Sequence, residues 1–392
     1  MGITNTSGVT PAAAPGTGAR VPAPDLARGL MLLAIAFAHA PLFVTDVGRG
    51  LPALNAVTDV IHNLFVSNHA RPMFAFLFGY SLVQLMNRRT ERGAAWVDVR
   101  RLLRRRGWWL VAIGLAHVVA LVPIDILAAY GISAVLLAGL LRARDATLLW
   151  TAGAGLVPAT AMVALAMWFP LSKGWSTLDA GSVAAGPRGA AELLVERLQG
   201  WPYTVAAGVI MVVPGVLAGM WAARRRVLDE PVRHRRFLAA FAVVAMTVST
   251  VGAVPVSLVR LGWWEASAAA LWGAAVAQPL TGYVGGIGMA AVAGLLAPVL
   301  TRRPNVVVTA VVTAVRALGQ RSMSLYLFQS VVFVAVFFPY GLGLQDDLGL
   351  AGATGVAAAT WLVSLLIADV MRRAGHRGPA EVLLRRLACR GT

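Results

Sequence analysis

The sequence predicts an all-α protein, a polytopic membrane helix bundle of about ten transmembrane helices. Three observations lead to this prediction. The chain of 392 residues is 58% hydrophobic and only 13% charged, far more apolar than a water-soluble domain. Apolar runs long enough to cross a bilayer recur along it. Arginines gather in short clusters between these runs, as they do in the loops of membrane proteins.

Ten apolar runs, each bounded by charge or proline, are the predicted spans. The third and fourth runs are short and separated only by Pro123, so we expect a tight helical hairpin whose turn contains Asp125. The runs lie near 26–46, 70–87, 108–122, 124–141, 148–170, 203–222, 237–259, 280–299, 322–339 and 350–370.

The remaining segments have three expected roles. Residues 1–24, rich in Ala, Pro, Gly and Thr, are expected to be a disordered tail, residues 25–388 a single transmembrane domain, and residues 389–392 a C-terminal tail. The amphipathic stretch 190–198 is expected on the membrane surface. The apolar stretch 264–278 is expected to be re-entrant or interfacial.

The basic residues predict the orientation. A formal net charge of +17 is also typical of nucleic-acid-binding proteins, but clusters beside apolar spans indicate cytoplasmic loops instead. If both termini are cytoplasmic, 28 of the 34 Lys and Arg residues lie inside. We therefore expect a multi-pass protein of the bacterial cytoplasmic membrane that contacts membrane lipid and no nucleic acid. The single cysteine, Cys389, excludes an internal disulfide and a zinc cluster.

Histidines supply the strongest chemical signal. Four of the six map to the outer half of the predicted bundle or its outer loops, and three aspartates map there too. Imidazoles beside carboxylates suit general acid–base catalysis. Polar packing contacts are an alternative, about equally favoured for His62. No metal-ligand spacing stands out, so no metal is expected. The residues are His39, His62, His69, His117, Asp46, Asp59 and Asp125.

Two predicted spans place polar side chains in an apolar setting. Arg28 and His39 are eleven residues apart, almost three helical turns, so they project from one face about 16 Å apart. Arg28 suits either a phosphate ligand or lipid headgroups. In the ninth span, Arg321, Ser324 and Tyr326 either line a polar cavity or bond neighbouring helices.

Five segments are informative through their order and spacing, namely Asp25–Leu30, Ser67–Tyr80, Asp125–Gly131, Gly319–Ser330 and Gly378–Arg385. Together they resemble the YeiB-like bacterial membrane family, domain of unknown function 418. The likeness runs from about residue 24 to residue 388. That family is distantly similar to transmembrane acyltransferases, including the lysosomal heparan-glucosaminide acetyltransferase and the acyltransferase-3 sugar O-acylating enzymes.

The resemblance implies transfer of an acyl group from cytoplasmic acyl-CoA, such as acetyl-CoA, to a hydroxyl or amine acceptor on the outer side. In the acyltransferase-3 group an Arg and a His separated by ten residues mark the first helix, and Arg28 with His39 reproduces that spacing. Many YeiB-like sequences have Asn in place of this His, so the implied base is either His39 or His69.

The other implied roles divide between the two reactants. His117 or Asp125 would orient the base. The donor phosphates would be held at the inner mouth by Arg28, Arg321 and the 100–106 cluster, whose guanidinium forks match phosphate geometry. Arg71, Ser324 and Tyr326 complete the expected donor site.

Two other classes of function stay open at the sequence level. In a small-molecule transporter or flippase, the buried Arg and His residues would be proton relays or counter-charges. A non-catalytic membrane protein would need them only for packing. The acceptor, a small molecule or a glycan, cannot be read from the sequence, and a homodimer is compatible with each alternative.

Overall fold

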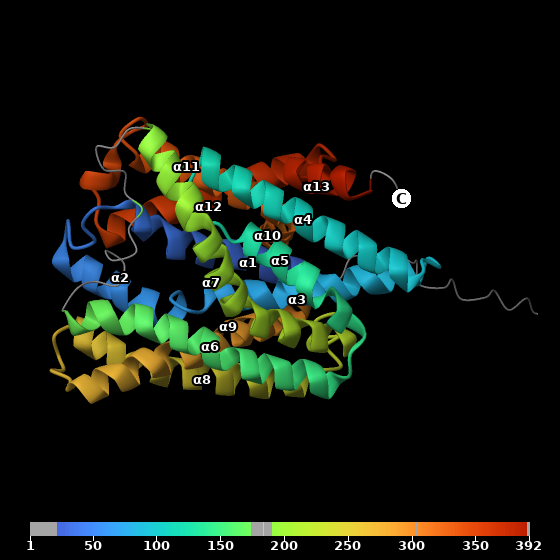
Figure 1. The fold of residues 1–392 in the computed structure, drawn as a ribbon, viewed down its shortest axis with the longest axis horizontal. Helices are drawn as coiled ribbons and strands as arrows, with labels where there is room; N and C mark the ends of the chain where they lie inside the picture. The colour runs from blue at the N-terminus through green and yellow to red at the C-terminus, as the bar shows by residue number, and fades with distance from the viewer. Residues whose placement is uncertain (1–21, 174–182, 184–189, 303–304, 390–392) are drawn as a thin grey trace, which may run out of the picture.

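The computed structural model describes residues 22–173, 183, 190–302 and 305–389, and within them every regular element is a helix (Figure 1). Short 3-10 helices are η1 (Ala40–Phe43), η2 (Ala138–Arg142) and η4 (Leu344–Asp346). The α-helices are α1 (Pro22–His39), α2 (Pro52–Phe65), α3 (Ala70–Thr90), α4 (Trp96–Ala120), α5 (Leu127–Leu137), α6 (Asp145–Ser172), α7 (Ala190–Arg224), α8 (Arg235–Arg260), α9 (Ala268–Arg302), α10 (Val306–Gln320), α11 (Ser322–Phe337), α12 (Leu350–Arg373) and α13 (Pro379–Cys389).

Six helices of the described chain are long and apolar enough to cross a membrane, namely α1 with η1, α6, α7, α8, α9 and α12. The helical membrane class is therefore confirmed, whereas the count of about ten spans is not. Helices α10 and α11, and α5 with η2, are apolar but shorter. Helices α3 and α4 include arginine clusters. The turn between α4 and α5 contains Pro123 and Asp125, as predicted.

Helix α2 was not predicted, and it forms a broken span together with α3. It runs antiparallel to α8: Asp59 pairs with Arg260, and the Asn63 side chain donates to Ala253 O at 2.8 Å. Four residues past α2, His69 contacts Ser249 Oγ in the middle of α8 at 2.6 Å. Because α8 is a complete candidate span, the break between α2 and α3 lies near mid-membrane depth.

The two faces of α2 confirm this placement. Its apolar side chains point outward, with Leu54 52% and Ile61 46% exposed, while Asn55, His62 and Asn63 are buried. Such an inverted helix is stable where its outer face meets lipid and its inner face finds polar partners. The predicted span 70–87 corresponds to α3, whose connection to α2 the sequence did not predict.

Three further expectations need correction. The stretch 190–198 is the first part of α7, which continues through Pro202, and the stretch 264–278 contributes the first turns of α9. Both helices continue through a proline, Pro202 in α7 and Pro279 in α9, because proline is tolerated in membrane helices. Helix α10, predicted as loop, packs along α1, where a Cβ on Gly319 would meet Asp25 O.

The helices extend slightly into both predicted tails. Residues 22–24 belong to α1, because Ala23 is buried in a cluster with Ala297 and Val312. Cys389 ends α13. Residues 1–21 and 390–392 lie outside the described residues.

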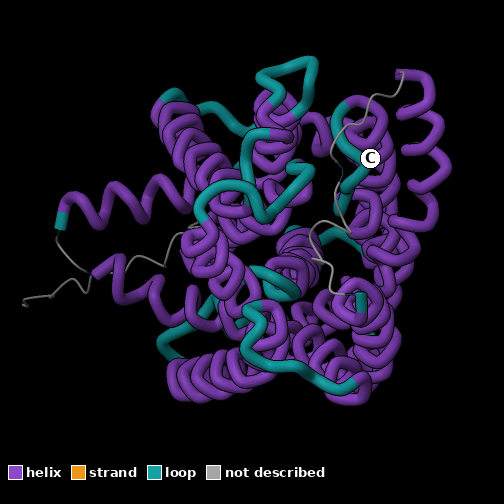
Figure 2. Tube along the Cα trace, turned by 90° about the vertical axis from the view of Figure 1, so that its left-hand side faces the viewer, coloured by secondary structure: helices purple, strands orange, loops and turns teal. Residues whose placement is uncertain are grey.

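Basic loops gather at one end of the bundle, which we call the basic end. It includes the α3–α4 turn, the α7–α8 loop and α13, all toward the right of Figure 1. Figure 2 views the bundle from the opposite end, with the helices seen nearly end-on. The Tyr80 hydroxyl anchors the α7–α8 loop by accepting hydrogen bonds from Leu228 N and Asp229 N at 3.1 and 3.0 Å.

Glycines allow α3 and α7 to touch at the backbone. A Cβ on Gly79 would lie 2.0 Å from Val216 O, and one on Gly219 would lie 2.0 Å from Phe76 O. These reciprocal contacts hold two helices whose side chains fill the main core cluster. Small residues at such a contact are typical of membrane helix pairs.

The variant Gly219→Ala is expected to destabilise the protein by about 2 to 3 kcal/mol, because the added methyl overpacks a backbone contact. The matched control is Gly153→Ala, where an added Cβ has no neighbour within 4 Å and helix propensity improves by about 0.5–1 kcal/mol. Thermal unfolding in detergent measures both. Equal melting temperatures for the two variants would contradict the packing described for α3 and α7.

Candidate functional site: an arginine-lined cavity and a buried histidine pair

A cavity of about 1470 Å³ enters the bundle from the basic end, between α1, α3, α4, α5, α11 and α13. Eight arginines and only four carboxylates line it, so its wall has an excess of positive charge. This composition suits a polyanionic ligand. The arginines are Arg28, Arg88, Arg92, Arg106, Arg226, Arg321, Arg377 and Arg385, and the carboxylates are Asp25, Glu91, Asp229 and Glu381.

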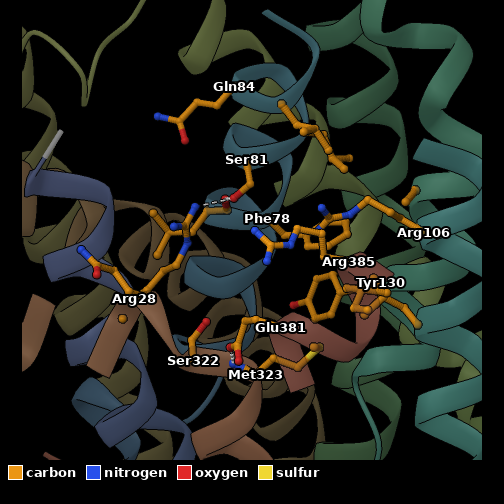
Figure 3. Close-up of a pocket in the computed structure, with 18 of the residues that line it drawn as sticks. Arg28, Phe78, Ser81, Gln84, Arg106, Tyr130, Ser322, Met323, Glu381 and Arg385 are labelled. Carbon is orange, nitrogen blue, oxygen red and sulfur yellow. Dashed lines mark hydrogen bonds between the residues drawn. The ribbon is translucent and has the colours of Figure 1, made fainter. Parts of the chain in front are cut away.

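The deep part of the cavity is apolar and aromatic. Leu110 of α4, Leu127 of α5 and Tyr326 of α11 lie there, and Tyr130 packs against Phe74 with ring centroids 4.5 Å apart. Figure 3 shows Arg28 on one side of the space and Arg106 and Arg385 on the other. The cavity therefore combines a cationic mouth with a narrow, mostly apolar interior.

Arg28 is held in place at this mouth. Its guanidinium donates to Asp25 Oδ1 at 3.2 Å and to Ser81 Oγ at 2.5 Å (Figure 3). Gln320 in turn donates to Asp25 Oδ2 at 2.9 Å. A guanidinium fixed this way keeps its charge toward the cavity with little rotamer entropy left to lose on binding.

The side chains of Arg321 and Ser324 bond to neighbouring protein groups and stabilise the wall of the cavity. Arg321 lines the cavity and donates to Ala317 O and His376 O. Ser324 donates to Glu381, whose carboxylate also accepts from Met323 N at 2.8 Å. Glu381 thus caps the start of α11 and fixes α13 against it. The sequence did not predict this contact, although Glu381 lies in the Gly378–Arg385 segment.

The Asp229 carboxyl lies on the cavity wall in the α7–α8 loop. Burial has the largest influence and raises its pKa, while hydrogen bonds from Gln84 and Tyr80 and the charges of Arg226 and Arg88 act in the opposite direction. Gln84 donates to Asp229 Oδ1 at 2.8 Å.

Behind the deep wall lies a buried imidazole–carboxylate pair. His117 Nδ1 is 3.4 Å from Asp125 Oδ1, and both side chains are almost completely buried. His117 Nε2 contacts Ser330 Oγ at 2.9 Å. Asp125 also accepts from Leu127 N and Ala128 N at the start of α5. The turn between α4 and α5 thus fixes the carboxylate that faces the ring.

Tyr326 separates this pair from the cavity. Its ring centroid lies 5.5 Å from that of His117 and 6.3 Å from that of His39, and its side chain lines the cavity. His39 is half-buried at the end of α1. The structure therefore brings together His39, His117, Asp125 and Tyr326. Ser330 was missed as a member, although its position one helical turn after Tyr326 could have indicated it.

His69 and His62 lie elsewhere. His69 Nδ1 donates to Ser67 O at 2.7 Å and its Nε2 contacts Ser249 Oγ at 2.6 Å, so both ring nitrogens have partners at the α2–α3 break. His62 Nε2 contacts Thr354 Oγ1 at 3.1 Å. These contacts join helices, the packing alternative stated for His62.

Arg71 also lies apart from the arginine-lined cavity. It is the second residue of α3, and it lines a separate small cavity with Thr160, Met211 and Tyr283. Tyr130, on the wall of the large cavity, donates to Arg71 O at 3.4 Å. The expected donor residues therefore divide: Arg28, Arg321 and Tyr326 share one cavity, whereas Arg71 and Ser324 do not line it.

Comparison with known proteins supports the family resemblance. The relative "Uncharacterized protein YxaH" of Bacillus subtilis (strain 168) is 23% identical over an alignment of 405 residues that covers 94% of this chain and 94% of the relative. Residues 222–391, from the end of α7 through α13, match the family described as "Protein of unknown function (DUF418)". The C-terminal part of the chain is therefore similar to this family.

Proposed function

We propose that this protein is a membrane-embedded acyltransferase that takes an acyl group from acyl-CoA and transfers it to a hydroxyl or amine acceptor. One observation supports this most strongly. The cavity with the arginine-lined mouth ends at Tyr326, and the His117–Asp125 pair lies directly behind that ring. A polyanionic donor and a general base would thus meet at one residue.

The mouth suits the nucleotide phosphates of the donor. Arg28, Arg106 and Arg385 surround the entrance from α1, α4 and α13, and guanidinium forks bind phosphate oxygens in pairs. The volume of about 1470 Å³ exceeds the range of about 300–1000 Å³ common for small-ligand pockets. The apolar depth suits the pantetheine arm, whose thioester would then lie beside Tyr326.

The His117–Asp125 pair supplies the base. Asp125 orients the ring through Nδ1, so Nε2 can take the proton from the acceptor once Ser330 releases it. The acceptor oxygen or nitrogen then attacks the thioester carbon, the carbon–sulfur bond breaks, and the CoA thiolate takes the proton back from the imidazolium. Tyr326 can donate a hydrogen bond to the carbonyl oxygen as charge develops there. The His39 ring lies 6.3 Å from that of Tyr326, where it can orient the acceptor.

The charge distribution supports an orientation for this reaction. Short basic loops are retained on the cytoplasmic side, so the basic end and the cavity mouth would face the cytoplasm, where acyl-CoA is available. The polar cluster around His117 would then receive its acceptor from the outer side.

The base assignment predicts the effect of His117→Ala. With purified protein, acetyl-CoA and a panel of amines and sugars, release of free CoA thiol is expected to fall at least about 100-fold, the usual contribution of a general base. Thiol release by Asp125→Asn is expected to decrease less, because the His117 ring stays in place. His234→Ala, in the α7–α8 loop, is the matched control and keeps the wild-type rate. Wild-type turnover by His117→Ala would contradict the assignment.

Donor binding predicts a second pair of variants. Arg385→Gln removes a cavity guanidinium and is expected to weaken CoA binding about tenfold, since one charge-assisted hydrogen bond contributes about 1.5 kcal/mol or more. Of the arginines in the 100–106 cluster only Arg106 lines the cavity, so Arg101→Gln, whose exposed partner is Asp98, is expected to bind like wild type. Equilibrium dialysis with labelled CoA measures both. Equal losses in the two variants would indicate a general charge effect rather than a site.

A further inference from the structure

Arg71 is a half-buried cation at the break of the α2–α3 span. It lies in the first turn of α3, two residues after His69, which contacts Ser249 in the middle of α8. The residue is therefore remote from the polar headgroups at both ends of the bundle. An ionisable side chain at this depth is costly and indicates function unless its charge is compensated.

No described carboxylate forms an ion pair with Arg71. Its side chain makes one hydrogen bond within the described residues, from Nη1 to the sulfur of Met211 at 2.9 Å. A guanidinium has five N–H donors, and a thioether is a weak acceptor. The charge and most of the donors of Arg71 thus lack a protein partner of opposite sign.

A second unpartnered group faces the same space. The small cavity beside Arg71 is also lined by Thr160 of α6, which is 9% exposed and whose hydroxyl has no hydrogen-bond partner. The N-terminal turn of α3, where Pro72 also lines the cavity, adds the positive end of a helix. No carboxylate is present in the lining of this cavity, and every charged group there is cationic.

We infer that this cavity is a binding site for one small monovalent anion of the chloride type. Such an anion supplies both missing partners, a negative charge for Arg71 and an acceptor for the Thr160 hydroxyl. Water would satisfy the hydroxyl but leave the charge. The volume of about 10 Å³ is close to the minimum for one water-sized sphere, so a phosphate or a carboxylate-bearing metabolite does not fit.

The anion cavity and the large cavity share no lining residue. The hydroxyl of Tyr130, which lines the large cavity, donates to the backbone oxygen of Arg71. Anion binding can therefore be measured on protein stability, without any assay of catalysis.

The test is a thermal-unfolding titration of the purified protein in detergent, in which sodium gluconate is replaced by sodium chloride at constant ionic strength. We expect the melting temperature to rise with chloride and to saturate. Thr160→Val, which keeps the side-chain volume, is expected to weaken the apparent chloride affinity about tenfold. Arg71→Gln is expected to abolish the response. Arg225→Gln, an exposed arginine paired with Asp145, is expected to retain it.

A second measurement covers the case in which Arg71→Gln does not fold. Crystals of the wild-type protein grown in bromide are expected to give an anomalous peak between Arg71 and Thr160, absent or weaker in Thr160→Val. An unchanged chloride response in Thr160→Val or Arg71→Gln, or a wild-type protein with neither chloride response nor bromide peak, would overturn the proposal.

Discussion

Lipid offers no hydrogen bonds, so each polar group inside this bundle must find its partner in the protein. The α2–α3 break depends on this constraint most directly. Its non-helical backbone persists at mid-membrane depth because Ser67 O accepts from His69, and because Asn63 and Gln278 bond across to the neighbouring helices. The same rule makes two groups at one small cavity informative: Arg71, which donates to the weakly accepting sulfur of Met211, and the Thr160 hydroxyl, which has no hydrogen-bond partner.

In the large cavity the polar groups meet the same requirement for partners through water. Arginines can line it only because water reaches them from the basic end, where their charges stay solvated. Farther in, the wall changes to Leu110, Leu127 and aromatic rings, and polarity returns only at Tyr326 and the pair behind it. This order of cationic, apolar and acid–base surfaces matches the parts of an acyl-CoA from its phosphates to its thioester.

The pattern of hydrophobicity was sufficient for the class of fold and for the hairpin at Pro123, because spans and breaks depend on local composition. It failed at α2, whose polar residues point inward and whose apolar face meets lipid, and at α10, whose flanking arginines hid a helix. Spacing along α1 placed Arg28 and His39 on one face. It could not separate His69 from His117, since that distinction depends on Ser249 and Asp125, which are far away in sequence.

The central claim is that one continuous cavity delivers a CoA thioester from the basic end to Tyr326. The most direct measurement is a structure of the protein with bound CoA. We expect the phosphates among Arg28, Arg106 and Arg385 and the thiol sulfur within van der Waals contact of the Tyr326 ring. CoA bound only at the surface of the basic end, with its thiol outside the cavity, would contradict the account.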